Sequence, residues 1–274
     1  MMIIDTHMHS GVVIGFDMSE DKVMASMNKY GIDIGIVSNI EATEGDHEPK
    51  LLPPNLQKSQ EDCLRDNIRF ARNNPGRIAL AAWVKPATQC VTDELETLIK
   101  ENRDIIVAMK FHPYHAVLPF DDKKMDAFIQ LAEKYSLVVV THTGGSDNAS
   151  PQRVYTMAKK YPTVNFVMVH MDLGSDNKEA IRLIGLLPNL YGDTTWVPLE
   201  SALQLIQEFG SKKLLFGSDA PIDGIDTYDH NPKGEPAVYR RYFNELPKRI
   251  SPQEYDDVMF KNAIQLFGLK SFIK

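Results

Sequence analysis

The stretch IIVAMKFHPYHAVLPFDDKKMDAFIQLAEKYSLVVVTHT (105–143) decides the fold class. It holds two short apolar runs, at 105–112 and 137–143, and between them a segment at 121–136 in which apolar side chains return every three or four residues. Nearly continuous apolar runs are typical of strands that a parallel sheet buries on both faces, and the longer period is that of an amphipathic helix. The stretch therefore predicts one strand–helix–strand unit.

The same alternation runs along the whole chain. Further strands are predicted at 2–9, 32–40, 78–85, 165–171, 190–195 and 213–219. Helices are predicted at 19–31, 91–102, 150–162, 178–188 and 199–209, and two more follow at 237–246 and 251–268. Eight strands alternating with helices predict an α/β fold, a single (β/α)8 TIM barrel with extra C-terminal helices that occupies residues 1–274 as one domain. An open doubly wound sheet is the alternative, but the first strand–helix junction, HSGVVIGF (9–16), lacks a G-x-G-x-x-G phosphate loop.

The bulk properties exclude several partners. The 274 residues carry a net charge of −7 and show no Lys/Arg cluster with interleaved aromatic residues, which argues against binding to nucleic acid or to an anionic membrane surface. No apolar run approaches the roughly 20 residues that span a bilayer, and no secretory signal precedes the first strand. The two cysteines, Cys63 and Cys90, fit no disulfide framework. We expect a cytoplasmic protein with free thiols and a small-molecule substrate.

Five of the eight histidines fall at the carboxyl ends of predicted strands. They are His7, His9, His112, His142 and His170, and Asp219 ends the last predicted strand. In a barrel these ends ring one mouth, where the active sites of this fold lie. His7 and His9 alternate on one strand and so point to the same face. A lone strand-end histidine is more often a hydrogen-bonded core residue, so it is the convergence that predicts a metal site. His47, His115 and His230 are expected to be solvated loop residues.

The segments DTHMH (5–9), MKFHP (109–113), THTG (141–144), VHMD (169–172) and LFGSDAP (215–221) together resemble the signature segments of the amidohydrolase superfamily. The similarity is strongest to the amidohydrolase-2 group, which contains small hydrolases, lactonases and decarboxylases, and NAIQLFGL (262–269) resembles its closing helix. The resemblance implies a metal site with the ligands His7, His9, His142 and Asp219, in which Asp219 is also the base. It further implies that His170 lies beside the metal and contacts the activated water or the substrate.

Three imidazoles and one carboxylate suit a divalent metal, most of all Zn²⁺, with Mn²⁺ or Fe²⁺ as alternatives. Some superfamily members bridge two metals with a carboxylated lysine, and Lys110 lies on the matching strand. In the amidohydrolase-2 group a comparable lysine is a free amine that faces the substrate. We therefore expect one metal and a catalytic role for the Lys110 amine; a plain surface charge at the barrel rim is the alternative for this residue.

These residues predict a hydrolase that uses a metal-activated water on a small ester, lactone or amide. The positive character of Lys110 and His112 predicts that the substrate carries an acidic group. Non-oxidative decarboxylation of a small carboxylic acid can use the same residues, and the compactness of the chain favours hydrolysis. A Schiff base on Lys110, as in barrel aldolases, and a ligand-binding barrel without catalysis are two hypotheses from different classes. Both leave the predicted ligand set without a role.

Two long loops and three aromatic residues are expected to set specificity at the mouth. The loops are 41–59, after the second strand, and 221–236, after Asp219. Trp83, Tyr114 and Trp196 lie at or just beyond strand ends and are predicted, with His112, to contact substrate, although single aromatic residues are more often packing residues. Apolar side chains near the C-terminus support either a homodimer or closure of the barrel flank. They are Tyr239, Phe243, Val258, Met259 and Phe260.

Overall fold

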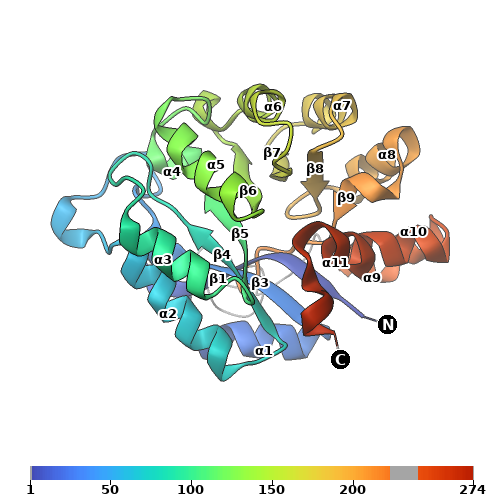
Figure 1. Ribbon diagram of the computed structural model, residues 1–274. Coiled ribbons are helices and arrows are strands. Elements are labelled where there is room, and N and C mark those ends of the chain that lie inside the picture. Colours follow the sequence, from blue (N-terminus) through green and yellow to red (C-terminus); the bar gives the residue numbers. More distant parts are fainter. Residues whose placement is uncertain (1, 223–239, 274) are drawn as a thin grey trace.

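The computed structural model describes residues 2–222 and 240–273. It shows an α/β fold in which one curled, almost entirely parallel sheet lies inside a ring of helices (Figure 1). The strands are β1 (Ile4–Val13), β2 (Phe16–Met18), β3 (Ile34–Asn39), β4 (Ile78–Trp83), β5 (Ile106–Phe111), β6 (Val138–Gly144), β7 (Phe166–Leu173), β8 (Leu190–Asp193) and β9 (Leu214–Leu215). The helices are α1 (Glu20–Tyr30), α2 (Gln60–Asn73), α3 (Asp93–Glu101), α4 (Pro113–Ala116), α5 (Lys124–Lys134), α6 (Pro151–Lys160), α7 (Lys178–Leu186), α8 (Leu199–Phe209), α9 (Arg240–Asn244), α10 (Pro252–Asp256) and α11 (Asn262–Phe267).

The strand order in the sheet is β2-β1-β3-β4-β5-β6-β7-β8-β9, which follows the chain except for β2. All eight predicted strands are present, and every pair is parallel except the β1–β2 hairpin, which the sequence pattern does not reveal. The last strand is shorter than predicted. Its continuation bonds to β1 instead: Thr6 N donates to Phe216 O and Asp219 N donates to His7 O, each at 2.9 Å. The curled sheet is therefore TIM-barrel-like, with β1 hydrogen-bonded to the segment that follows β9.

The space enclosed by the curled sheet is filled with small aliphatic side chains. They come from alternate strand positions, such as Ile34 and Ile36 on β3 or Val138 and Val140 on β6, because every second residue of a strand points inward. Phe267 of α11 packs against the same cluster and closes the end opposite the carboxyl ends of the strands. Each such buried side chain contributes about 1.5–3 kcal/mol relative to an exposed one. This end of the sheet is thus a packed core, and the free space lies at the other end.

Helix α2 is absent from the predicted elements, although it fills the position of a crossover helix between β3 and β4. Its sequence, QEDCLRDNIRFARN, buries polar residues along with apolar ones, among them Gln60, Glu61 and Asn67. The apolar residues Leu64, Ile68 and Ala71 nevertheless recur at four- and three-residue steps, so the sequence does carry the helical period that the prediction overlooked. The start of the helix is also encoded locally, because the Ser59 hydroxyl accepts a hydrogen bond from Asp62 N at 3.0 Å and so caps the first turn.

The C-terminal helices close one flank of the fold. The predicted helix at 251–268 is realised as α10, a π-helical turn at Asp257–Lys261 and α11 in unbroken succession. Val258 and Met259 are fully buried within the chain, which favours closure of the flank for these two residues. Tyr239 and most of the predicted 221–236 loop lie outside the described residues. Within the described part of the chain, no helix is both long enough and apolar enough to cross a membrane.

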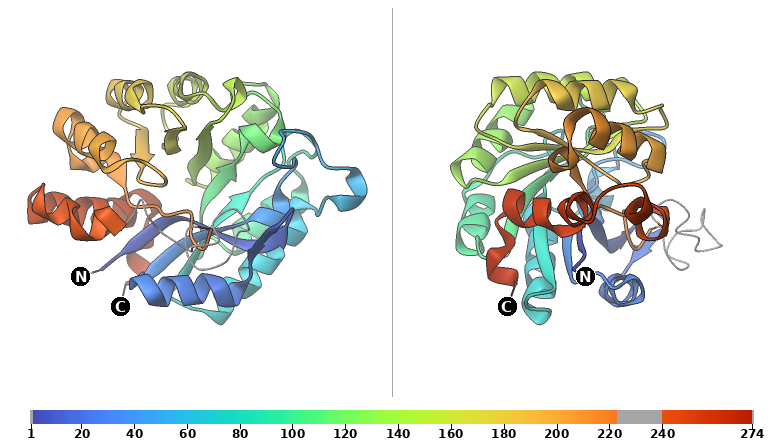
Figure 2. Two further views of the ribbon diagram at one scale, coloured as in Figure 1. Left: turned by 180° about the vertical axis from the view of Figure 1, so that it is seen from behind. Right: turned by 90° about the vertical axis from the view of Figure 1, so that its right-hand side faces the viewer.

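The two described chain ends lie on the same side of the molecule in all three views (Figures 1 and 2). The segment around residue 50, part of the predicted 41–59 loop, projects from the edge of the helical ring (Figure 2). The first part of that loop does not project. Thr43, Glu44 and Gly45 are buried against neighbouring segments, so this part of the loop is docked on the body of the fold.

Candidate active site

The predicted strand-end residues meet in one cavity of about 130 Å³ at the carboxyl ends of the parallel strands. The cavity is lined by seven residues predicted for the site, namely His7, His9, Lys110, His112, His142, His170 and Asp219. Trp83, predicted to contact substrate, lines it as well. Tyr114 and Trp196 are not among the lining residues. The Tyr114 hydroxyl donates to His47 O at 3.1 Å, and the Trp196 indole contacts Asp219.

Three of these residues form a compact group of possible metal ligands. His7 Nε2 and His9 Nε2 lie 3.1 Å apart, and Asp219 Oδ1 lies 3.2 Å from the first and 3.0 Å from the second. All three side chains are buried. Two imidazole nitrogens and a carboxylate oxygen converging on one point are a donor set that suits a divalent cation. His142 contributes no atom to this group; its ring lies 4.7 Å from the ring of His170, between the centroids.

A hydrogen-bond partner lies behind His9. The Ser38 hydroxyl oxygen lies 3.0 Å from His9 Nδ1 and 3.5 Å from Met8 O. The Ser38 oxygen is placed to accept from His9 Nδ1–H, and in that tautomer His9 Nε2 has its lone pair available for a cation. This is the arrangement found behind metal-bound histidines, whose second nitrogen donates to an acceptor outside the site. The residues present therefore fit a bound cation.

Asp5 joins the two strand ends that carry the group. Its Oδ1 accepts from His7 N and from Ser218 N, each at 3.1 Å, and its Oδ2 accepts from the Ser218 hydroxyl. Burial raises the pKa of Asp5 to about 7. Asp5 is fully buried and does not line the cavity, and the register of β1 against β3 shifts between Asp5 and Met8. It holds β1 against the segment that presents Asp219.

Four imidazoles of the cavity are neutral at ordinary pH. Burial lowers the pKa values of His7, His112 and His142 well below the usual range, and it lowers the pKa of His170 to about 4. Asp219 behaves in the opposite way. Burial raises the pKa of its carboxyl, but the hydrogen bonds with His7 and His9 outweigh burial and hold the pKa well below its ordinary value. The cavity thus combines one carboxylate with uncharged imidazoles that retain lone pairs.

His170 is held with one nitrogen facing away from the cavity. Its Nδ1 lies 3.2 Å from Thr195 O, and because a carbonyl can only accept, Nδ1 carries the proton and Nε2 the lone pair. The backbone N–H of His170 donates to Asp193 Oδ1 at 3.0 Å. His170 also has a left-handed backbone, with φ of 70°. Non-glycine residues in this region cost of order 1–3 kcal/mol and cluster at functional sites.

Lys110 is buried and lines the cavity. The alternative interpretation, that it is a surface charge at the barrel rim, is therefore wrong. Lys110 is only 1% exposed, its Nζ lies 3.5 Å from His7 Nε2, and it lies 5.6 Å from the centre of the Trp83 ring. Burial lowers the pKa of Lys110 to about 7, against the attraction of Asp219 and Asp193. Its amine is therefore poised between charged and neutral forms at neutral pH.

His115 lines the cavity, so the expectation that it is a solvated loop residue is wrong. Its Nδ1 lies 2.8 Å from the Thr43 hydroxyl, which itself donates to Gly45 O at 2.9 Å. Nδ1 must then carry the proton, and Nε2 is left as an acceptor. The signal was present in HPYH, because a three-residue spacing on a short helix such as α4 places His112 and His115 on one face. Their ring centroids are 4.2 Å apart.

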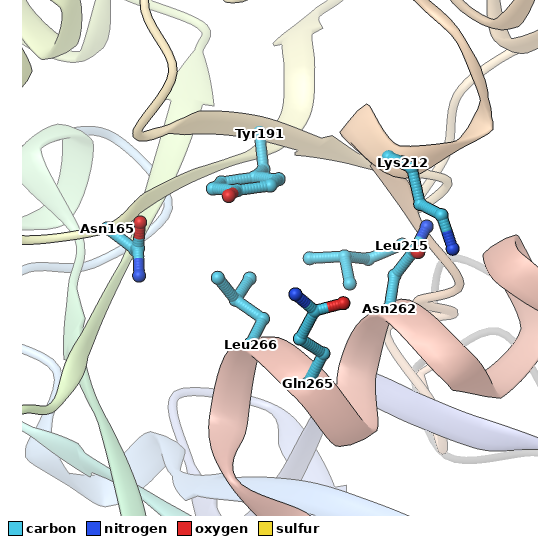
Figure 3. A pocket seen from close by; sticks show the side chains of 7 residues that line it. All are labelled: Asn165, Tyr191, Lys212, Leu215, Asn262, Gln265 and Leu266. Carbon is cyan, nitrogen blue, oxygen red and sulfur yellow. The ribbon is translucent and has the colours of Figure 1, made fainter.

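A separate cavity of about 360 Å³ lies at the opposite end of the strands (Figure 3). In it Tyr191 of β8 faces Leu266 and Gln265 of α11 across the open space. None of its described lining residues is a histidine or a carboxylate. The residue types that carry metal or acid–base chemistry are therefore concentrated at the strand ends that hold Asp219.

Residues 4–269 match the amidohydrolase family over nearly the whole chain. The chain belongs to that family. Members of this superfamily are metal-dependent enzymes, and hydrolases, decarboxylases and hydratases occur among them. No curated protein sequence matches the chain significantly.

Solved structures of similar fold include several enzymes of this superfamily. One is 5-carboxyvanillate decarboxylase from Sphingomonas paucimobilis, with a TM-score of 0.68 and 13% identity over 97% of this chain and 99% of that one. A second is 4-oxalomesaconate hydratase from Rhodopseudomonas palustris, with a TM-score of 0.66 and 19% identity over 98% and 96%. A third is a dihydroxybenzoic acid decarboxylase from a Polaromonas species with bound manganese, with a TM-score of 0.66 and 16% identity over 98% and 97%. At these identities the likeness is one of fold.

Proposed function

We propose that this chain is a metal-dependent hydrolase of a small ester, lactone or amide that carries an acidic group. The observation that carries the proposal is the buried convergence of His7, His9 and Asp219, with ligand atoms 3.0–3.2 Å apart, in the same cavity as Lys110 and His170. Membership of the amidohydrolase family supports the use of a divalent metal there. The volume of about 130 Å³ favours a small substrate.

Four residues would hold one metal ion. His7, His9 and Asp219 supply three ligand atoms, and His142, from the end of β6, would supply the fourth. Three nitrogens and one oxygen favour Zn²⁺, with Mn²⁺ or Fe²⁺ as alternatives; manganese is present in one structure of similar fold. When bound, such an ion lowers the pKa of a water molecule and polarises a carbonyl oxygen of the substrate.

The remaining steps fall to the side chains of the cavity. His170 Nε2, whose lone pair is free because Nδ1 donates to Thr195 O, would accept a hydrogen bond from the attacking water and orient it. Asp219 would take the proton of that water and return it to the leaving group. Lys110 would bind the acidic group of the substrate. His112 would assist, since its Nδ1 accepts from His115 N at 3.3 Å and its Nε2–H is left as a donor.

Non-oxidative decarboxylation of a small carboxylic acid is the second candidate, and the solved structures of similar fold favour it. Two of those named above are decarboxylases, and the matched regions span 99% and 97% of their chains. The compactness of this chain is therefore a weaker argument for hydrolysis than the sequence alone implies. In that reaction Lys110 would supply a proton to the substrate carbon in place of binding an acidic group.

We also propose that β1 and β3–β9 form a closed (β/α)8 barrel and that residues 1–274 are one domain. Its support is the set of hydrogen bonds between β1 and the segment after β9, including His9 N to Ala220 O at 2.9 Å. An experimental structure tests this directly. An eight-stranded closed sheet is expected, and a gap between β1 and the segment at 216–220 would contradict it.

The reaction is tested with Zn²⁺-loaded protein on a panel of small lactones, esters, amides and aromatic acids. We expect release of acid from one of the first three classes, and loss of that activity in Asp219→Asn, whose amide cannot accept the proton. Release of carbon dioxide from an aromatic acid, with no hydrolysis of any panel member, would assign the decarboxylase instead. Trapping of a carbonyl substrate on Lys110 by borohydride would favour the Schiff-base hypothesis.

A further inference from the structure

The two oxygens of Asp219 have different partners. Oδ1 faces His7 Nε2 and His9 Nε2, while Oδ2 accepts a hydrogen bond from the indole Nε1–H of Trp196 at 2.8 Å. The indole nitrogen is a donor only and does not titrate, so this bond is available at every pH. Trp196 itself does not line the cavity. The indole side chain therefore reaches the site through its bond to Asp219.

The segment that presents the indole is fastened to the segment that presents Asp219. The Thr194 hydroxyl donates to Gly217 O at 2.8 Å and accepts from Gly217 N at 3.0 Å. Gly217 permits this contact, because a Cβ there would lie 2.6 Å from Thr195 Oγ1. Two short stretches, at the ends of β8 and β9, are thus held in register by a reciprocal pair of hydrogen bonds.

Both ends of the indole–carboxylate bond sit on left-handed backbone. Trp196 has φ of 56° and Asp219 has φ of 67°. Such conformations persist in non-glycine residues only where the surroundings over-determine them. Here the two residues meet across neighbouring strand ends through the bond from Nε1–H to Oδ2. This geometry directs the indole Nε1–H of Trp196 to Oδ2 of Asp219.

We propose that Trp196 is a positioning residue that holds Asp219 with only Oδ1 presented to the cation. This inference rests on the proposed metal site and extends it to a residue outside the cavity. With Oδ2 engaged by the indole, the carboxylate is fixed in one rotamer and binds through a single oxygen. Without the indole, Oδ2 is released and the carboxylate is free to rotate, so the preorganisation of the ligand set is lost.

The expected effect is on metal affinity. Loss of a hydrogen bond behind a metal ligand typically weakens metal binding by about 10–100-fold. Trp196→Phe removes the donor and keeps an aromatic ring, so we expect its Kd for Zn²⁺ to rise within that range. Trp196→His and Trp196→Gln restore an N–H donor, and at least one of them is expected to recover part of the affinity.

Tyr242→Phe is the matched control. The fully buried Tyr242 hydroxyl donates to Val197 O at 2.8 Å, one residue beyond Trp196. Its removal takes one hydrogen bond from the same loop without touching Asp219. A general loosening of the loop would weaken Zn²⁺ binding in this variant too, whereas positioning of Asp219 by the indole leaves its Kd for Zn²⁺ at the wild-type value.

The experiment measures the Kd for Zn²⁺ by competition with a chromophoric chelator, the absorption spectrum of the Co²⁺-loaded protein, and the thermal unfolding of the metal-free protein. We expect a weaker Kd and an altered Co²⁺ spectrum in Trp196→Phe alone, with rescue by a donor-bearing variant. Equal Kd values in wild type and Trp196→Phe would overturn the inference and leave the proposed function standing. Wild-type protein that binds no Zn²⁺ would overturn the proposed function and the inference together. If Trp196→Phe does not fold, Trp196→Leu, which also lacks the donor, is compared with Trp196→Gln, and equal Kd values for Zn²⁺ in these two variants would overturn the inference.

Discussion

Asp193, at the carboxyl end of β8, should make the protein less stable as pH rises from about 4 to about 7. It is fully buried, its Oδ1 accepts from His170 N and Thr195 N at 3.0 and 3.2 Å, and its Oδ2 accepts from the Thr195 hydroxyl at 2.8 Å. Burial raises the pKa of this carboxyl from 3.8 to about 7. The folded protein therefore keeps, across this interval, a proton that the unfolded chain releases. Its stability falls as pH rises, and the penalty is complete above the folded pKa.

The size of the effect follows from the shift in pKa. About three pKa units at 1.36 kcal/mol each give about 4 kcal/mol as an upper bound. Asp193→Asn preserves the oxygen that accepts from both backbone N–H groups and cannot ionise. We expect the variant and the wild type to be equally stable near the unfolded pKa of an aspartate, and the variant to be more stable by up to about 4 kcal/mol at about pH 8.

Urea unfolding of both metal-free proteins between about pH 4 and pH 8 measures this difference directly. Acid effects common to the whole chain cancel, because only the difference between variant and wild type is read. A difference that does not change with pH, or a variant that is the less stable protein at pH 8, would show that the pKa of Asp193 is not raised in the folded state. The proposed electrostatics of the cavity floor would then be wrong.

Three further predictions concern single contacts of the site. Thr43→Val removes the hydroxyl that accepts from His115 Nδ1; because His115 lines the cavity, its other nitrogen then offers substrate a different group, and KM should rise by about fivefold, the equivalent of one hydrogen bond, while Thr43→Ser keeps the wild-type KM. Lys110→Ala should raise KM for an acidic substrate by roughly tenfold or more, and an unchanged KM would remove Lys110 from substrate binding. Gly217→Ala places a Cβ 2.6 Å from Thr195 Oγ1, and chemical denaturation should show a loss of about 1–3 kcal/mol.

The meeting of the strand-end histidines is predictable from two simple features of parallel strands. A strand repeats every two residues, which places His7 and His9 on one face, and parallel strands end at one edge, which brings His112, His142 and His170 to the same cavity. Nothing beyond the order of strands and helices is needed for this inference. In the structure this pattern appears as the group of His7, His9 and Asp219, whose possible ligand atoms all lie within 4.8 Å of one another.

Other parts of the site cannot be predicted from any local sequence pattern. Trp196 bonds to Asp219 from a left-handed backbone conformation, which the sequence does not signal in a non-glycine residue. In LYGDTT nothing distinguishes Asp193 from an ordinary residue at the end of a strand, because its burial depends on the strands on either side. His115 depends on the Thr43 hydroxyl, which is 72 positions away in the chain. Each of these features is decided by tertiary packing.

The central claim is that His7, His9 and Asp219 bind one divalent cation, and metal content per chain tests it most directly. Elemental analysis after reconstitution with Zn²⁺ should give about one equivalent in the wild type and a large loss in His9→Ala. His47→Ala, which alters an exposed histidine outside the cavity, should retain the wild-type content. Undiminished metal in His9→Ala would contradict the account, and close to two equivalents in the wild type would contradict the single-metal site.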